Sequence, residues 1–223
     1  MPHQFHLELQ DLKTNLIRMA SIVDDQIQKA ISSLIGGNVS LYKEIKSKDD
    51  EVDAYDELLQ VQCENILALH QPIAYDLRLV LTTLMINNQL ERCGDLSVSI
   101  ASRARKMKNY NELIVESGID EMGLEAQKMI SRSIDSFIHL NSDLAEQVIK
   151  NDDKVDVLNK HLFAFITAKM KDNPELIEPL AHLLILARQL ERLADHATNI
   201  SENLLFLIEA KVVTHRKLIE TGK

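Results

Sequence analysis

The sequence predicts an all-α protein built as two tandem three-helix bundles, with six long antiparallel helices related by a pseudo-two-fold axis. Composition is the first observation behind this prediction: the 223 residues include only 6 Gly and 4 Pro, and aromatic residues make up 4%. Such a sequence, rich in Leu, Ile, Ala, Glu and Lys, favours helix over sheet. The second observation is an internal repeat, and the third is a set of breaks that divides the chain into helix-length segments.

The repeat is visible in two blocks of aligned sequence. Residues 26–53 align without a gap onto residues 129–156, and residues 77–102 align onto residues 177–202. A period of about a hundred residues is too long for a solenoid repeat and fits a duplicated small domain. We therefore expect two similar domains, over residues 1–110 and 111–223.

Three helices are predicted in the first half, over residues 5–36, 39–69 and 73–108. Gly36 and Gly37 can adopt the left-handed conformation that ends a helix. Asn38 is a natural N-cap for the second helix, and Pro72 suits the first turn of the third.

Three more helices are predicted in the second half, over residues 112–140, 143–171 and 174–214. They are separated by Asn141 and Asp143, both good N-cap residues, and by Pro174 at a first turn. The polar stretch from Met107 to Gly118 has no repeat partner and is the expected joint between the halves. Because the loops are short, neighbouring helices should run antiparallel, and each half should close as a three-helix bundle.

Charge and hydropathy limit the classes of function. A net charge of −9 argues against nucleic acid as a partner, because phosphate binding depends on clustered Lys and Arg. The densest apolar run, Leu180–Ala187, is far shorter than the roughly 20 residues that span a bilayer. Residues 1–5 do not resemble a secretory signal, so we expect a cytoplasmic protein. Cys63 and Cys93 are expected to be reduced core residues.

Acidic residues continue the apolar pattern of two predicted helices. On a helical wheel, Leu77, Leu81 and Leu84 mark one face of the third helix, and Glu91 and Asp95 fall on the same face. The sixth helix repeats the pattern, with Ile177, Leu180 and Leu184 followed by Glu191 and Asp195. We therefore predict that these acids face inward, where an unpaired carboxylate is costly unless a counter-charge compensates it.

The second and fifth predicted helices add more acid at aligned positions. Asp49 and Asp53 are four residues apart and share a helix face, as do Asp152 and Asp156. Carboxylates from two helices should thus converge in each half, and oxygen-only clusters suit cations such as Mg²⁺, Mn²⁺, Ca²⁺ or Fe. The predicted metal ligands are Asp53, Glu91, Asp95, Asp156, Glu191 and Asp195, with Asp49, Asp152 and Asn199 as additional candidates.

Two alternatives to metal remain open for these acids. They could form interhelical salt bridges with Arg78, Arg103 or lysines, which would give a metal-free helical scaffold protein. They could also belong to a carboxylate-bridged metal storage protein or oxidase, but that class uses Glu-x-x-His on a four-helix bundle. No Glu lies three residues before any of the 8 His residues. No arrangement for nucleophilic catalysis is present either, so we predict that the protein is not an enzyme.

Several motifs resemble the PhoU family of phosphate-signalling regulators. They are the run from His70 to Val80, the segment Glu91-Arg-Cys-Gly-Asp95, and the segment from Glu191 to Glu202. The similarity covers essentially the whole chain and implies two three-helix bundles with surface metal clusters. It places Glu91, Asp95, Glu191 and Asp195 in the metal-binding motifs, with Asp53 and Asp156 contributed by the second helix of each bundle.

The resemblance also implies a role in phosphate homeostasis. A PhoU-like protein would restrain phosphate-starvation genes by linking the ATPase subunit of a phosphate transporter to a sensor histidine kinase. We accordingly expect a homodimer that binds divalent or trivalent metal ions (Fe, Mn, Mg or Zn), meets the membrane only through its partners and binds no nucleic acid.

Overall fold

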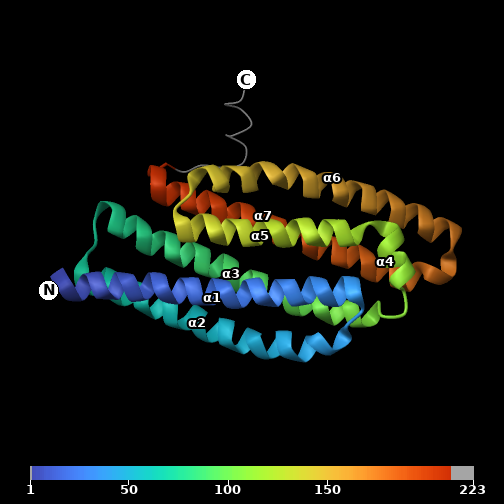
Figure 1. Cartoon of the computed structure of the whole chain (residues 1–223), viewed down its shortest axis with the longest axis horizontal. Helices are drawn as coiled ribbons and strands as arrows, with labels where there is room; N and C mark the ends of the chain where they lie inside the picture. Colours follow the sequence, from blue (N-terminus) through green and yellow to red (C-terminus); the bar gives the residue numbers. More distant parts are fainter. Residues whose placement is uncertain (1, 212–223) are drawn as a thin grey trace, which may run out of the picture.

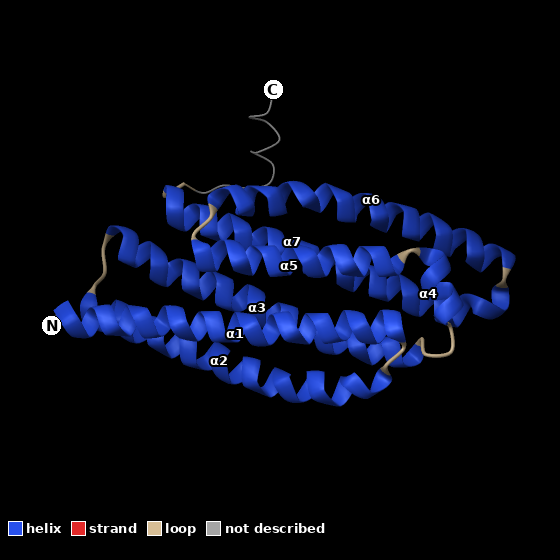
Figure 2. Ribbon diagram, viewed as in Figure 1, coloured by secondary structure: helices blue, strands red, loops and turns tan. Residues whose placement is uncertain are grey.

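The computed structural model describes residues 2–211 of the chain, and this part is helical with no β-strand. Short loops join the helices (Figure 2). The elements of the first half are α1 (Pro2–Gly36), the 3₁₀ turn η1 (Val39–Leu41), α2 (Tyr42–His70) and α3 (Ala74–Lys106). Those of the second half are α4 (Asn111–Ser117), α5 (Ile119–His139), α6 (Ser142–Asp172), η2 (Pro174–Leu176) and α7 (Ile177–Glu209).

Several helix ends follow the predicted capping residues, but Pro72 precedes α3, which begins at Ala74, and is not in its first turn. Asn141 accepts a hydrogen bond from the backbone nitrogen of Leu144 at 3.0 Å, as an N-cap should. The single helix predicted over 112–140 is wrong, because Gly118 has a φ of 71° and separates α4 from α5. The predicted end of the last helix at residue 214 lies outside the described residues.

The six long helices form the two predicted bundles (Figure 1). α1, α2 and α3 pack against one another, and α5, α6 and α7 do the same. The two bundles meet along α3 with α7 and along α1 with α5. The fold class predicted from the sequence is therefore confirmed.

The apolar interior runs without interruption through both bundles. Buried side chains from every long helix belong to one cluster, including Leu16 of α1, Leu90 of α3 and Leu190 of α7. Cys63 and Cys93 are buried free thiols, as predicted. Because the interior is continuous, the boundary between residues 110 and 111 stays a prediction.

The side of α3 that is buried differs from the side that Leu77, Leu81 and Leu84 marked on the helical wheel. Val80, Asn87 and Leu90 lie inside the bundle, whereas Leu81 and Met85 are 37% and 45% exposed. The prediction that the acids of α3 and α7 point inward is therefore wrong. It failed because Thr, Asn, Ser and Gly occupy much of the buried side of α3. The helical wheel took the leucines as the mark of the buried face, and most of them lie on the other side.

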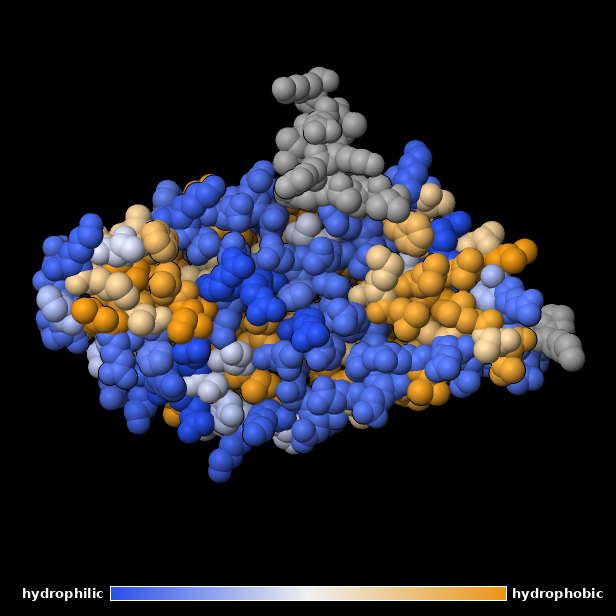
Figure 3. Space-filling model, turned by 180° about the vertical axis from the view of Figure 1, so that it is seen from behind, coloured by the Kyte–Doolittle hydropathy of each residue, from blue (hydrophilic) through white to orange (hydrophobic). Residues whose placement is uncertain are grey.

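The acids lie on the outside of the bundles as a result. Asp95 and Asp195 are exposed, while Glu91 and Glu191 are half-buried at the edge of the helix contacts. The back of the molecule shows apolar side chains gathered near its two ends, with hydrophilic side chains between them (Figure 3). In the described part of the chain, no helix combines the length and apolar character that crossing a membrane would require.

Candidate metal centres

The first acidic group consists of Asp49 and Asp53 on α2 and Glu91 and Asp95 on α3. The register of these two helices is fixed by a hydrogen bond from Asn87 Nδ2 to Asp56 Oδ1 at 2.6 Å. This bond lies one turn away from both pairs of acids. The structure therefore brings carboxylates of α2 and α3 into one region, as the repeat predicted.

Burial, followed by the charges of neighbouring carboxylates, raises the pKa of three members of this group, Asp49, Asp53 and Glu91. Burial and then the neighbouring charge of Asp95 raise the pKa of Asp53 and that of Glu91. Burial also raises the pKa of Asp49; a hydrogen bond from Gln26 opposes this shift, and Asp53 and Asp95 add to it. Uncompensated negative charge of this kind is what a bound cation would relieve.

Little basic charge compensates this group. Arg92 Nε lies 3.4 Å from Glu91 Oε2, and Arg92 Nη1 lies 3.8 Å from Asp95 Oδ2, both at the long end of ion-pair distances. Glu91 Oε2 is buried and accepts no hydrogen bond. An anionic oxygen shielded from water without a donor is a candidate ligand atom for a metal ion.

Gly94 allows α2 to approach α3 at this point. A Cβ atom at position 94 would lie 3.1 Å from Asp49 Oδ1 and 3.3 Å from Gln26 Oε1. Gln26 of α1 in turn donates to the Ile45 carbonyl oxygen at 3.1 Å and to Asp49 Oδ1 at 3.4 Å. The missing side chain thus leaves room for the carboxylate of Asp49 beside the acids of α3.

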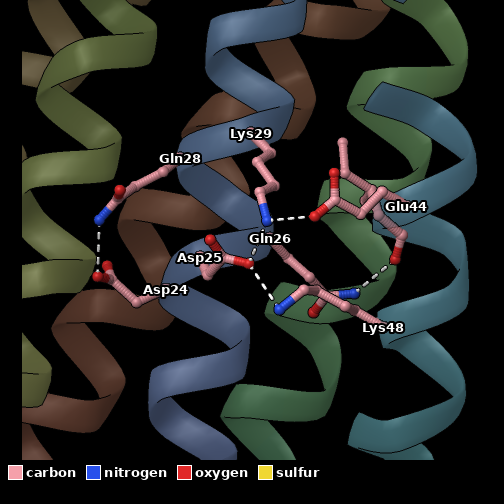
Figure 4. A network of polar contacts seen from close by, with 8 residues as sticks. Asp24, Asp25, Gln26, Gln28, Lys29, Glu44 and Lys48 are labelled. Carbon is pink, nitrogen blue, oxygen red and sulfur yellow. Dashed lines mark hydrogen bonds and ion pairs between the residues drawn. The ribbon is translucent and has the colours of Figure 1, made fainter. Parts of the chain in front are cut away.

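Neighbouring acids on α1 and α2 are neutralised in the ordinary way. Lys29 and Lys48 both bind Asp25 Oδ2 at 2.8 Å, and Lys29 also binds Glu44 at 2.6 Å (Figure 4). Burial would raise the pKa of Asp25, but the two lysines lower it. The contrast is one of distance, because the ion pairs of Arg92 with the first acidic group are 3.4 and 3.8 Å long.

The second acidic group consists of Asp152 and Asp156 on α6 and Glu191 and Asp195 on α7. Burial raises the pKa of Asp195, with further contributions from Glu191 and Asp156. Glu191 has a closer ion pair than any acid of the first group, because Arg188 Nη1 lies 2.5 Å from Glu191 Oε2. The second group is therefore partly compensated by an arginine.

Asn199, the remaining candidate ligand, forms a contact with α3 of the other half. Asn199 Nδ2 donates to Gln89 Oε1 of α3 at 3.2 Å, and His196 Nδ1 lies 2.8 Å from the same oxygen. Burial, followed by the charges of Arg192 and Arg92, lowers the pKa of His196 to about 4. These side chains join α7 to α3 across the interface between the halves.

The salt-bridge alternative is realised only in part. Arg78 Nε donates to the carbonyl oxygen of Leu207, and Arg103 Nη1 contacts His182 Nδ1, so neither arginine suggested as a partner is placed on the acids. Among the residues that the structure describes, however, no three His, Cys, Asp or Glu side chains are grouped closely enough to hold a metal ion as they stand. Exposed carboxylates would have to rotate to share an ion.

Sequence reasoning missed three residues that shape these groups. They are Gly94, Arg188 and Gln26, which stand opposite Ala194, Asn88 and Met129 in the repeat. The alignment gave a signal for Gly94 and Arg188, because the halves differ there within or just before an acidic motif; Gln26 lies far from Asp49 in sequence and gave none. Only the structure shows that these differences touch the carboxylates.

Comparison with protein families gives a match on both halves. The model described as "PhoU domain" matches residues 16–104 and again residues 119–204. A phosphate-specific transport system accessory protein PhoU homolog of Aquifex aeolicus is 35% identical over 216 residues, which cover 97% of this chain and 98% of that protein. The homolog of the same name from Pseudomonas aeruginosa is 31% identical over 215 residues, covering 95% and 88%.

Solved structures agree with the family match. The crystal structure of PhoU from Pseudomonas aeruginosa superposes with a TM-score of 0.88 at 30% identity, covering 93% of this chain and 100% of that one. The phosphate transport system regulatory protein PhoU from Streptococcus pneumoniae gives a TM-score of 0.85 at 28% identity, covering 94% and 99%.

Proposed function

The chain belongs to the PhoU family, and on that premise we propose that it is an accessory protein that regulates a phosphate-specific transport system. The observation that carries this proposal is the family match to both halves, joined to a fold shared over nearly the full length with two solved PhoU structures. The fold offers long exposed helical surfaces, which suit contacts with partner proteins.

In its finer form, the proposal is that the protein acts as a negative regulator. It would restrain phosphate uptake and phosphate-starvation genes by linking the transporter ATPase subunit to a sensor histidine kinase, as a cytoplasmic homodimer. The support for these partners is the family relationship, since no described feature of either bundle identifies a partner.

A genetic test addresses the regulatory role. The gene is expressed in a bacterial host that lacks its own PhoU protein, and a phosphate-starvation reporter and phosphate uptake are measured in phosphate-rich medium. We expect both to be repressed, and the transporter ATPase or the sensor kinase to copurify with the tagged protein. A reporter that stays fully active, with no partner captured in rich or poor medium, would contradict the proposal.

We also propose that the first acidic group binds a divalent or trivalent metal ion. Asp49 and Asp53 would hold it from α2, and Glu91 and Asp95 from α3. Two features support this site: Glu91 Oε2 is buried without a hydrogen bond, and Gly94 leaves space for the Asp49 carboxylate. The ion would supply positive charge that neutralises the carboxylates and ties α2 to α3. The second acidic group would bind more weakly, because Arg188 competes for Glu191.

Metal analysis of the protein purified without chelator tests this proposal. We expect the double variant Glu91→Gln/Asp95→Asn to lose most of the metal of the first half, with helicity unchanged in circular dichroism. Asp172→Asn/Glu175→Gln is a matched control, because it removes the same charge at the exposed turn between α6 and α7. Wild-type protein that holds no metal after reconstitution with Fe, Mn, Mg or Zn would favour the metal-free scaffold.

A metal-free scaffold is the second candidate, and one observation favours it. Glu191 already has an arginine partner at 2.5 Å, so one of the predicted ligands is ion-paired without metal. The carboxylate-bridged oxidase has no corresponding support, since neither acidic group contains a Glu-x-x-His pair.

A further inference from the structure

The end of α3 carries a basic pocket in an otherwise acidic protein. Arg105, Lys106 and Lys108 line it together with Ser102 and Val39. None of its described lining residues is acidic, although the whole chain has a net charge of −9. The end of α3 lies beside the turn between α1 and α2 (Figure 1), and η1 closes one side of the pocket.

Among the described residues, no carboxylate forms an ion pair with any of these three cations. Arg105 stacks over the ring of Tyr42, with its guanidinium carbon 4.6 Å from the ring centre, which fixes the side chain and leaves its donors available. Elsewhere in the molecule exposed lysines such as Lys29 and Lys169 do find acids.

The surroundings add to the positive charge. Arg103, one turn before Lys106, contacts His182 of α7 at 3.1 Å, and its Nε is buried without a hydrogen-bond partner. Burial, and then the charges of Lys106 and Arg103, lower the pKa of His182, so this imidazole stays neutral at pH 7. Arg103 thus adds a cation beside the pocket, while Glu178 is an acid close enough to His182 to oppose part of this shift.

A structural role for these cations explains only part of the arrangement. Basic residues in a last helical turn offset the helix dipole, each by about 0.3–1 kcal/mol. That effect accounts for Arg105 and Lys106, which lie in the last turn of α3. It does not account for Lys108, which lies beyond the helix end, or for a pocket free of acids between them.

We propose that this pocket binds a phosphate-bearing anion. Two ammonium groups, a guanidinium and the Ser102 hydroxyl are the donors that recognise phosphate oxygens, and an arginine can engage two of them at once. The pocket is recessed between α3 and η1, which suits a compact soluble anion such as inorganic phosphate or pyrophosphate better than a flat lipid surface. This inference goes beyond the proposed function and uses none of the acidic residues assigned to metal.

Calorimetric titration with inorganic phosphate and with pyrophosphate tests the proposal at constant ionic strength, with sodium chloride as the control for general screening. The protein is first treated with chelator, so that the anion cannot bind through a metal ion and the result is independent of the metal proposal. We expect saturable binding of one anion, with pyrophosphate tighter than phosphate, and a loss of affinity of at least about tenfold in Lys106→Gln/Lys108→Gln.

Two matched variants sharpen the result. Lys128→Gln/Lys160→Gln removes the same charge at exposed sites on α5 and α6 and should bind as wild type does. Lys106→Arg/Lys108→Arg should retain most of the affinity. Absence of saturable binding by wild type, or equal losses in the pocket and control variants, would overturn the proposal. Binding to phosphatidylglycerol vesicles without binding to either soluble anion would overturn the assignment to a compact soluble ligand.

Discussion

At the scale of single residues, two differences separate the acidic groups of the halves. Gly94 stands opposite Ala194, and Asn88 stands opposite Arg188. The first difference leaves room for Asp49 beside α3. The second gives Glu191 an arginine at 2.5 Å, whereas the arginine beside Glu91, Arg92, lies at 3.4 Å. Equal motifs in the two halves therefore do not imply equal metal affinity.

The substitution Gly94→Ala tests the space beside Asp49. Its Cβ would sit 3.1 Å from Asp49 Oδ1, so we expect that carboxylate to swing away and metal affinity of the first half to fall by at least about tenfold. Stability should change by less than about 1 kcal/mol, because the gain in helix propensity opposes the crowding. Metal titration and thermal melting check both statements. Unchanged affinity would mean that Asp49 does not contribute, and Ala194→Gly serves as the control.

Exchange of residues between the halves tests the role of the arginine. Arg188→Asn should raise metal affinity of the second acidic group by up to about fivefold, because an exposed ion pair contributes roughly 0.2–1 kcal/mol. The reciprocal Asn88→Arg should weaken the first group by a similar factor. Both are measured by competition with a fluorescent chelator. Affinities that do not respond to either change would show that Arg188 does not compete with the metal.

At the scale of helices, capping residues and the repeat predicted most of the architecture. Asn141 and the Gly36-Gly37 pair lie at helix ends, and the helices that carry the aligned aspartates do pack as expected, α2 on α3 and α6 on α7. The direction in which α3 faces was not predictable from its leucines, because Thr83, Asn87 and Ser97 are buried where apolar residues were expected. Their burial has different local settings: Asn87 bonds to Asp56 of α2, which is distant in sequence, whereas Ser97 donates to the Cys93 carbonyl oxygen of its own helix.

The contact between α1 and α5 includes a carboxyl group whose protonation should favour folding. Burial raises the pKa of Asp24, and the nearby charges of Asp135 and Asp25 raise it further; one of its oxygens is buried without a hydrogen-bond partner. Because the pKa is higher in the folded state, the folded protein binds more protons in this range. The contribution of Asp24 therefore becomes less favourable as pH rises from its unfolded pKa through its folded pKa.

Asp24→Asn removes this charge while preserving the shape of the side chain. We expect the variant to melt about 2 °C higher than wild type at pH 7, and the difference to shrink as pH falls toward 4. Thermal melts of both proteins across this pH range check the prediction. Asp143→Asn, at the exposed start of α6, is the control for general charge effects. A variant that is less stable at pH 7 than at pH 4, relative to wild type, would contradict it.

At the scale of the whole molecule, duplication has produced halves that share one interior. α3 packs on α7 and α1 on α5, and apolar residues of both bundles form a single cluster. The interface is also held by polar contacts in both directions, from Gln89 to His196 and from Gln189 to Ser99.

A shared interior predicts that the two halves unfold together. The chain contains no Trp, so Tyr55→Trp on α2 and Phe165→Trp on α6 each place one fluorescent probe in a half-buried position of one bundle. We expect urea unfolding of the two variants to show the same midpoint and slope, and both to coincide with loss of helicity in circular dichroism, as a two-state transition requires. An isolated bundle would expose the faces of α1 and α3 that now contact α5 and α7. Separate midpoints for the two probes would show instead that each bundle is stable without its neighbour, and that the interface between α3 and α7 contributes little.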